Sequence, residues 1–177
     1  MQLTGKEIIA NNIISNYVEA GVQQQGIDVR IKNVSLVGPE IGFVPAEGKT
    51  LIPEYIQLSP VLDNTMNCEV FWLDPGYYEI ELMEGCEIPS NATLHFKTRS
   101  SLVRCGAMVH SGQFDAGFKT NNMGCFLLTT RPIKIEVGAR IAQALVFTSS
   151  DVENLYDGQW QNDKQRNGKM TNNAMAK

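Results

Sequence analysis

Short apolar or alternating segments follow one another from Gly26 onward, and they constrain the fold more than any other feature. The segments are IDVRI, VSLV, YIQL, EVFWL, YYEIEL, ATLHF, IKIEV and ALVF, and Gly, Pro, Asn and Asp separate them. Runs of this length between turn residues are typical of β-strands. Because no helices alternate with them, we predict an all-β fold: an antiparallel sandwich, a jelly roll or a small barrel.

One helix is expected at the start of the chain. Thr4 to Glu7 fits a capping box, and isoleucines follow at helical spacing, which predicts a short amphipathic helix over residues 5–17. The 177 residues fit a single domain, which we place at residues 1–161. Residues 162–177 are polar and poor in branched apolar side chains, so we predict a flexible tail.

Composition excludes several classes of protein. The chain is 43% hydrophobic and 19% charged, and it has no apolar run near the roughly 20 residues of a membrane span. A net charge of -4 argues against a nucleic-acid surface. The first residues lack the pattern of a secretory signal, so we expect a cytoplasmic protein. The four cysteines and two histidines do not have zinc-site spacing.

Two stretches could carry chemistry. Residues 98–106, TRSSLVRCG, bring together Arg99, Ser100, Ser101 and Arg104, which are donors suited to phosphate oxygens. The alternative is a solvated strand end. Residues 111–119, SGQFDAGFK, indicate a β-hairpin arm in which glycines allow close approach of a ligand and Asp115 could act as a general base. The alternative is an ordinary turn aspartate.

Two further stretches carry polar residues in unusual places. In residues 137–147, VGARIAQALVF, Arg140 and Gln143 are the polar exceptions in an apolar strand, which is also consistent with a core strand and a solvated arginine. Residues 155–169 set Tyr156, Trp160 and Gln161 beside amides and cations. This segment could close over an anion, or it could be a frayed terminus.

Together these stretches resemble the family of deoxyuridine triphosphatases (dUTPases) and deoxycytidine triphosphate (dCTP) deaminases, from Gly26 to about Gln161. GIDV (26–29), RSSLVR (99–104), GQFDAGF (112–118) and GARIAQ (138–143) are similar to the first four motifs of that family. The N-terminal helix, FWLDPGYYEIEL and YDGQWQ further resemble its deaminase branch. The resemblance implies a distorted jelly roll or β-barrel, assembled as a homotrimer with active sites at the subunit interfaces.

The resemblance also implies roles for single residues. Asp115 would deprotonate a water molecule that attacks the α-phosphorus, while Mg²⁺ is held through the triphosphate and water rather than by protein ligands. Asp28 and Arg140 would support the site from behind. The residues implied to bind substrate are Arg99, Ser100, Ser101, Arg104, Gly112, Gln113, Phe114, Phe118, Gln143, Tyr156 and Gln161, with Phe118 packing against the deoxyribose.

The choice between hydrolysis and deamination depends on one carboxylate. Deaminases of this family use a glutamate on the strand after the aspartate, but no Asp or Glu lies between Asp115 and Glu136, and the position falls on Leu128 or Thr129. We therefore predict hydrolysis of dUTP to dUMP and pyrophosphate, catalysed by a dUTP diphosphatase. Alternatives are a dCTP deaminase-like enzyme, a hydrolase for dCTP or a modified pyrimidine nucleotide, and a non-catalytic nucleotide-binding regulator.

Overall fold

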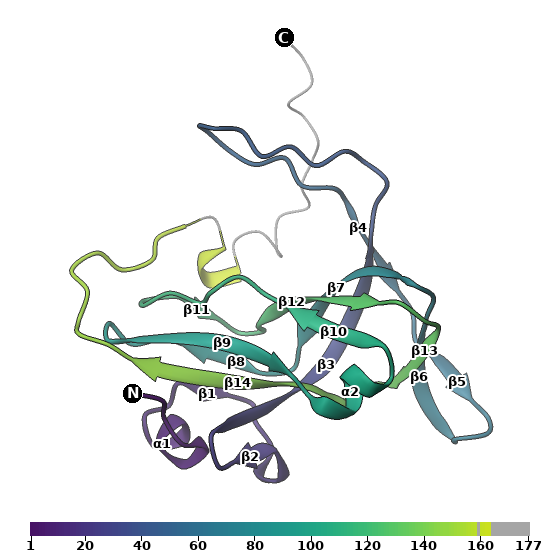
Figure 1. Cartoon of the computed structure of the whole chain (residues 1–177), viewed down its shortest axis with the longest axis horizontal. Coiled ribbons are helices and arrows are strands. Elements are labelled where there is room, and N and C mark those ends of the chain that lie inside the picture. Colours follow the sequence, from purple (N-terminus) through teal and green to yellow (C-terminus); the bar gives the residue numbers. More distant parts are fainter. Residues whose placement is uncertain (159, 164–177) are drawn as a thin grey trace.

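The computed structural model describes residues 1–158 and 160–163 of the chain. These residues form an eight-stranded sheet and two three-stranded sheets, all antiparallel, with short helices at the edges (Figure 1). Of the tail predicted to be flexible, residues 164–177 lie outside the described part. The flexibility of the tail and the domain boundary at residue 161 therefore stay predictions.

The helical elements are short: α1 (Gly5–Ala10), α2 (Ser100–Arg104) and the 3-10 turns η1 (Glu19–Gly21) and η2 (Gln161–Asp163). The strands are β1 (Ile14–Ser15), β2 (Val22–Gln23), β3 (Gly26–Val37), β4 (Tyr55–Leu58), β5 (Val61–Asp63), β6 (Cys68–Leu73), β7 (Gly76–Leu82), β8 (Gly85–Glu87), β9 (Ala92–Thr98), β10 (Ala107–His110), β11 (Lys119–Thr120), β12 (Gly124–Thr129), β13 (Ile133–Glu136) and β14 (Arg140–Thr148). Seven of the eight segments expected to be strands lie wholly in strands, and IKIEV lies in β13 up to Glu136, so the all-β prediction is confirmed.

The main sheet curls into a distorted, nearly closed barrel. Its strand order is β10-β12-β7-β3-β14-β9, with β2 and β4 also paired to β3. The two end strands meet through Thr98, whose hydroxyl accepts a hydrogen bond from the Val109 backbone N–H at 2.9 Å and donates to the Val109 carbonyl at 3.3 Å. This contact closes the seam between β9 and β10.

The inward positions of these strands form one continuous apolar core. Alternate residues of β7 are buried, and β3 and β14 contribute a fully enclosed centre, because both run through the middle of the sheet. The largest fully buried side chains are Ile8, Ile13, Ile27, Ile31, Phe71, Leu73, Ile80, Leu82, Leu94, Met123, Leu127 and Ile141. The two β-strands that carry Asp28 and Gln143 are thus held rigidly from within.

The prediction for the first helix was right in its start and wrong in its end. The capping box is present, since the Glu7 N–H donates to the Thr4 hydroxyl and the Thr4 N–H donates to the Glu7 carboxylate. The helix ends at Ala10 instead of residue 17, and Asn12 turns the chain with a φ of 53°. Ile14 then pairs with Cys86 of β8, because strand pairing buries it better than another helical turn would.

The stretch expected to form a hairpin arm also differs in detail. β10 and β12 pair as neighbouring antiparallel strands, and residues 111–123 connect them. Phe114 bridges to Leu94 of β9, and β11 pairs with β8 rather than with β10. Residues 111–118 are thus a loop laid along β9 and not a two-stranded arm.

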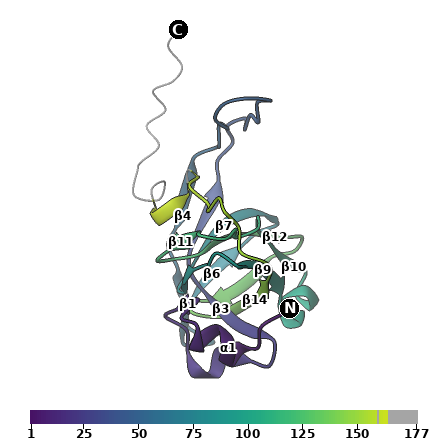
Figure 2. The ribbon, with the colours of Figure 1, turned by 90° about the vertical axis from the view of Figure 1, so that its left-hand side faces the viewer.

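A different segment does project from the barrel. Residues 38–54 leave β3 and return to β4 as a long arm (Figures 1 and 2). Phe43 and Leu51 hold it together by exchanging two backbone hydrogen bonds of 2.9 Å. Across the described ranges, no helix has the length and apolar character needed to cross a membrane.

Candidate active site

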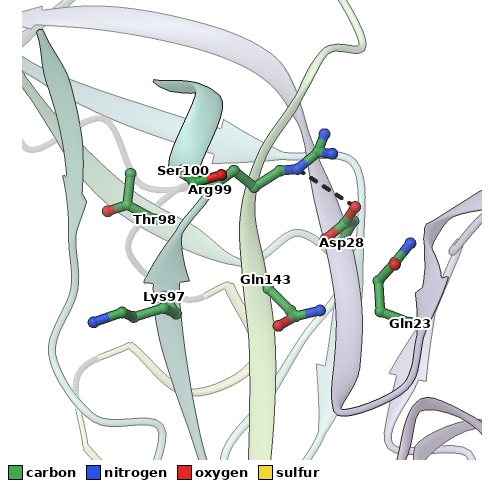
Figure 3. Close-up of a pocket in the computed structure, with 7 residues that line it drawn as sticks. All are labelled: Gln23, Asp28, Lys97, Thr98, Arg99, Ser100 and Gln143. Atoms are coloured by element: carbon green, nitrogen blue, oxygen red, sulfur yellow. Dashed lines mark ion pairs between the residues drawn. The ribbon is translucent and has the colours of Figure 1, made fainter. Parts of the chain in front are cut away.

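A row of polar side chains crosses three neighbouring strands on one face of the barrel. Gln143 of β14 pairs with Asp28 of β3 on one side and with Lys97 of β9 on the other. These three residues line a pocket of about 250 Å³ with Gln23, Thr98, Arg99 and Ser100 (Figure 3). Because the row is set by strand register, its members cannot separate without breaking the sheet.

Asp28 is the buried anchor of this pocket, with only 3% of its surface exposed. Its Oδ2 atom lies 3.5 Å from Nε of Arg99 and 3.4 Å from a terminal guanidinium nitrogen of Arg140. Burial raises the pKa of the Asp28 carboxyl above its ordinary value, and the two arginines offset this only in part. One carboxylate therefore orients two cations, of which Arg99 lines the pocket (Figure 3).

Arg140 contacts Asp28 next to the pocket. Its guanidinium donates to the Ala20 carbonyl at 2.6 Å as well as to Asp28, and its own carbonyl accepts from Arg99 at 3.3 Å. Its partners tie the start of β14 to η1 and to Arg99. Arg140 does not line the pocket, and its supporting role stays a prediction.

The serine and arginine donors predicted in residues 99–104 belong to α2. Leu102 is buried and fixes this short helix on the barrel, and Gly106 ends it with a φ of 84°. Ser100 faces the pocket, whereas Ser101 and Arg104 are exposed and do not line it. The stretch is a helical turn, so consecutive residues point in different directions and only part of the predicted donor group meets in this chain.

Asp115 lies in the loop along β9. It is exposed, and Gln113 donates to its Oδ1 atom at 2.7 Å. In the part of the chain that the structure describes, Oδ2 makes no hydrogen bond. Phe114 fixes the loop to β9 through two backbone hydrogen bonds with Leu94, of 3.0 and 3.1 Å. The carboxylate is thus oriented at one oxygen and open at the other.

A row of aromatic rings runs from the barrel to the segment that carries Tyr156 and Gln161, which we call the C-terminal segment. Phe96, Phe114, Phe118 and Tyr156 follow one another edge to face, with ring centroids 5.1, 5.4 and 5.3 Å apart. Edge-to-face packing at such distances is favourable. Tyr156 also donates its backbone N–H to Ala116 at 2.9 Å, and Gln161 bonds to the backbone on both sides of Phe118. The C-terminal segment therefore lies on the loop of its own chain.

The predicted site residues thus fall into two groups that one chain does not bring together. Asp28, Arg99, Ser100 and Gln143 meet at the pocket. The second group, which is on or against the loop, consists of Gln113, Phe114, Asp115, Phe118, Tyr156 and Gln161. Phe114 is bridged to Leu94, three residues before Lys97, so the part of the loop that carries Asp115 meets β9 about 10 Å from the pocket. Gly112 is exposed, and among the described residues no atom other than those of its chain neighbours lies within 4 Å of where its Cβ would be.

Sequence reasoning missed three residues of the pocket: Gln23, Lys97 and Thr98. Lys97 is exposed and has no ion-pair partner within the described residues, and its side chain extends away from the Arg99 and Asp28 pair (Figure 3). The available signal was its place two residues before Arg99, near the end of β9. That signal becomes useful only when the pairing of Lys97 with Gln143 is known.

The acidic side chains do not gather as metal ligands. Within residues 1–158 and 160–163, no group of three or more His, Cys, Asp or Glu side chains could hold a metal ion. Asp28 already faces two arginines. The donor set of the pocket, two cations and several amides and hydroxyls, suits phosphate oxygens better than a metal ion.

Comparison with known proteins identifies the family. Residues 3–149 match the family described as dCTP deaminase-like. The chain belongs to this family. The crystal structure of the 2'-deoxycytidine 5'-triphosphate deaminase from Agrobacterium tumefaciens has the same fold, with a TM-score of 0.57 at 18% identity. The match covers 82% of this chain and 47% of the deaminase chain, so this family member spans about half the length of that structure.

The relatives include proteins named as nucleotidohydrolases and a protein named as a deaminase. A protein of Halobacterium salinarum, named probable deoxyuridine 5'-triphosphate nucleotidohydrolase, is 34% identical over 143 residues, covering 81% of this chain and 84% of its own. The deoxyuridine 5'-triphosphate nucleotidohydrolase of Methanocaldococcus jannaschii is 30% identical over 84% of this chain and 92% of its own. A dUMP-forming dCTP deaminase of Methanoregula boonei is 28% identical over 81% of this chain and 78% of its own.

Proposed function

We propose that this protein is a dUTP diphosphatase, which converts dUTP and water to dUMP and pyrophosphate. The observation that carries the proposal is the identity of 30 to 34%, over four-fifths of the chain, to proteins named deoxyuridine 5'-triphosphate nucleotidohydrolases. The reaction forms a bond between the water oxygen and the α-phosphorus and breaks the bond from that phosphorus to the α–β bridging oxygen. Pyrophosphate leaves with that oxygen.

Asp115 is the proposed general base. The Gln113 amide holds Oδ1 at 2.7 Å, which leaves Oδ2 to accept a proton from the attacking water. The exposed position suits a base that must meet both solvent and substrate. General-base catalysis of this kind contributes about 10²- to 10⁴-fold to a rate.

The pocket is the proposed site of the triphosphate. Arg99, Ser100 and Gln143 present a guanidinium, a hydroxyl and an amide on one face, and Asp28 fixes Arg99 from behind. Ser101 and Arg104 are proposed to contact the outer phosphates from the exposed side of α2. A bound Mg²⁺, held by the phosphates and water, would spread the negative charge that builds up on the leaving pyrophosphate.

The loop is the proposed site of the nucleoside. Gly112 leaves open space where a side chain would stand, which allows a pyrimidine to approach the backbone. Phe118 is half-buried between Phe114 and Tyr156, so its ring has a fixed orientation for packing against a deoxyribose. Such a fixed ring would exclude a 2'-hydroxyl by contact.

A working site then needs more than one copy of the chain. The loop group and the pocket group are complementary in chemistry, since one has the base and the sugar platform and the other has the phosphate donors. Within one chain the Phe114 bridge, next to Asp115, lies about 10 Å from the pocket residue Lys97 along β9. A homotrimer, in which the loop of one subunit faces the pocket of the next, would supply both halves at each interface.

Deamination of dCTP is a second candidate because of the Methanoregula boonei relative. It would need a group that exchanges protons near the base. On β12 the candidate positions are Leu128 and Thr129, and the Thr129 hydroxyl is buried and donates to the Arg131 carbonyl at 2.6 Å. A non-catalytic nucleotide-binding regulator would use the same pocket, and only an assay separates it from an enzyme.

The deciding experiment is pyrophosphate release from purified protein with dUTP and Mg²⁺. Replacement of Asp115 by Asn keeps the shape of the side chain and removes its basicity, so we expect a loss of about 10²- to 10⁴-fold in kcat. The exposed Asp74, in the turn between β6 and β7, gives the matched control Asp74→Asn, which should leave the rate unchanged. No turnover by the wild type, or full turnover by Asp115→Asn, refutes the proposal.

A substrate panel separates the remaining candidates. We expect turnover of dUTP to exceed that of dCTP, dTTP and UTP. Release of ammonia from dCTP would instead support the deaminase, and binding without any product would support the regulator.

A further inference from the structure

Gln161 uses both amide hydrogens and accepts one hydrogen bond at its amide oxygen, all with the protein backbone. Its Nε2 donates one hydrogen to the Gly117 carbonyl at 2.8 Å and the other to the Tyr156 carbonyl at 3.1 Å. Its Oε1 accepts the backbone N–H of Lys119 at 2.8 Å. A glutamine amide has two donor hydrogens, and here both are in use. None remains to donate to a nucleotide.

These bonds brace the loop on both sides of Phe118. Gly117 and Lys119 are its two neighbours in the chain, and the Phe118 N–H itself donates to the Asp115 carbonyl at 3.0 Å. The left-handed backbone at Gly117, with a φ of 85°, aims its carbonyl at Gln161. A Cβ at this position would lie 2.7 Å from Cβ of Leu155, so the C-terminal segment and the loop fit only with glycine here.

We propose that Gln161 is a positioning residue, which holds the loop that carries Asp115 and Phe118, and not a contact to the substrate. This inference rests on the proposed function, because it assigns Gln161 a role in the reaction of that same loop. It replaces the direct role that the family resemblance implied. Tyr156 assists it, with its N–H on Ala116 and its ring against Phe118.

The physical consequence is a coupling within one subunit. Asp115 is exposed and lies only two residues from Gly117, so its position depends on how firmly the loop is held. When Tyr156 and Gln161 are seated on the loop, the carboxylate is oriented before substrate arrives, which lowers the cost of reaching the reactive geometry. When they are not, the loop keeps its attachment at Phe114 and Leu94 but loses the brace beyond Asp115.

The test uses the full-length chain with two variants and one control. Gln161→Met removes every hydrogen bond of the amide, and Gln161→Glu keeps an acceptor for Lys119 but loses both donors. Gln57→Met makes the same change at an exposed position of β4. The readouts are exchange of the Lys119 amide hydrogen by NMR, kcat with dUTP, and affinity for inorganic tripolyphosphate, which occupies only a phosphate pocket.

We expect Gln161→Met to speed exchange of the Lys119 amide and both Gln161 variants to lower kcat by about fivefold for each hydrogen bond lost. Affinity for tripolyphosphate should stay within error of the wild type for all three proteins, because Gln161 does not touch the phosphates. Gln57→Met should match the wild type in every readout.

Other results overturn the inference. A fall in tripolyphosphate affinity in the Gln161 variants would make Gln161 a substrate contact. Unchanged exchange at Lys119, or unchanged kcat with an active wild type, would show that the brace does not position the loop. Failure of the proposed function is distinct from both, since the wild type itself would then release no pyrophosphate while the exchange readout still tests the contact.

Discussion

The pocket and the loop both present polar groups that we propose bind a nucleotide, but different structures hold those groups in place. Asp28, Gln143 and Lys97 are fixed by the register of three paired strands over a closed core. Asp115 and Phe118 are fixed by a loop, a bridge at Leu94 and side-chain bonds from a segment more than forty positions away. The groups proposed to bind phosphate are therefore part of the barrel, whereas the proposed general base is on a loop attached to it.

This difference suits the two tasks. A triphosphate is bound through charge and needs donors at fixed spacing, which a sheet supplies without adjustable parts. A general base must approach the reacting water closely and still allow product to leave, which favours a loop that can be seated and released. A change in the barrel should therefore affect stability and binding together, and a change in the loop should affect turnover first.

The loop and the pocket can be inactivated in different subunits, and this experiment should give the largest change in activity. Asp115→Asn and Arg99→Gln should each be nearly inactive alone. If a site takes its loop from one subunit and its pocket from another, random mixing of the two variants leaves about a quarter of the sites with both halves intact. Subunits mixed by denaturation and refolding should recover activity of about that size in the pyrophosphate assay. No recovery would mean that each chain forms its own complete site.

Lys97 should give a smaller effect, confined to binding. Its ammonium is unpaired in the described part of the chain and stands at the pocket, so Lys97→Met removes one cation that a triphosphate can recruit. We expect KM for dUTP to rise by about 3- to 10-fold with little change in kcat. Lys49→Met, on the exposed arm, serves as the matched control. A selective fall in kcat would contradict a binding role.

A still smaller effect is expected on the stability of the barrel around Asp28. Because burial raises the pKa of Asp28 in the folded chain above its ordinary 3.8, the folded state takes up a proton at this site more readily than the unfolded state. The stability that Asp28 contributes is therefore fully present below pH 3.8 and is lost as the pH rises through the folded pKa. Urea unfolding of the wild type and of Asp28→Asn, compared from pH 3.5 upward, should show the wild type losing stability relative to the variant. A difference that grows in the opposite direction would show that the arginines outweigh burial.

The sequence predicted the strands themselves better than it predicted which strands and residues lie next to one another. Strand segments such as EVFWL and YYEIEL carry their own periodicity, so they could be found without knowing their partners. The helix over residues 5–17 was too long, because Ile13 and Ile14 suit either structure and the pairing with β8 decides between them. Lys97 and Gln23 were missed for the same reason, since they become pocket residues only through their neighbours on other strands.

The sequence predicted which motifs supply pocket residues, but it did not predict how each side chain is oriented within a motif. The Asp28, Arg99 and Gln143 motifs do meet, although 115 positions separate the first from the last. Ser101 and Arg104 were expected beside Ser100, but a helical turn directs them elsewhere. The bonds of Gln161 could not be foreseen, because they join backbone groups whose orientation only the loop conformation sets.

Thr98 takes part in two features of the barrel. Its hydroxyl joins β9 to β10 at the seam, and the residue also lines the pocket. A ligand seated there would contact the residue whose hydroxyl joins the first and last strands of the main sheet. Occupancy would then resist unzipping of the sheet at the place where it is joined by a side chain instead of a ladder, and the protein would become harder to open when its nucleotide is abundant.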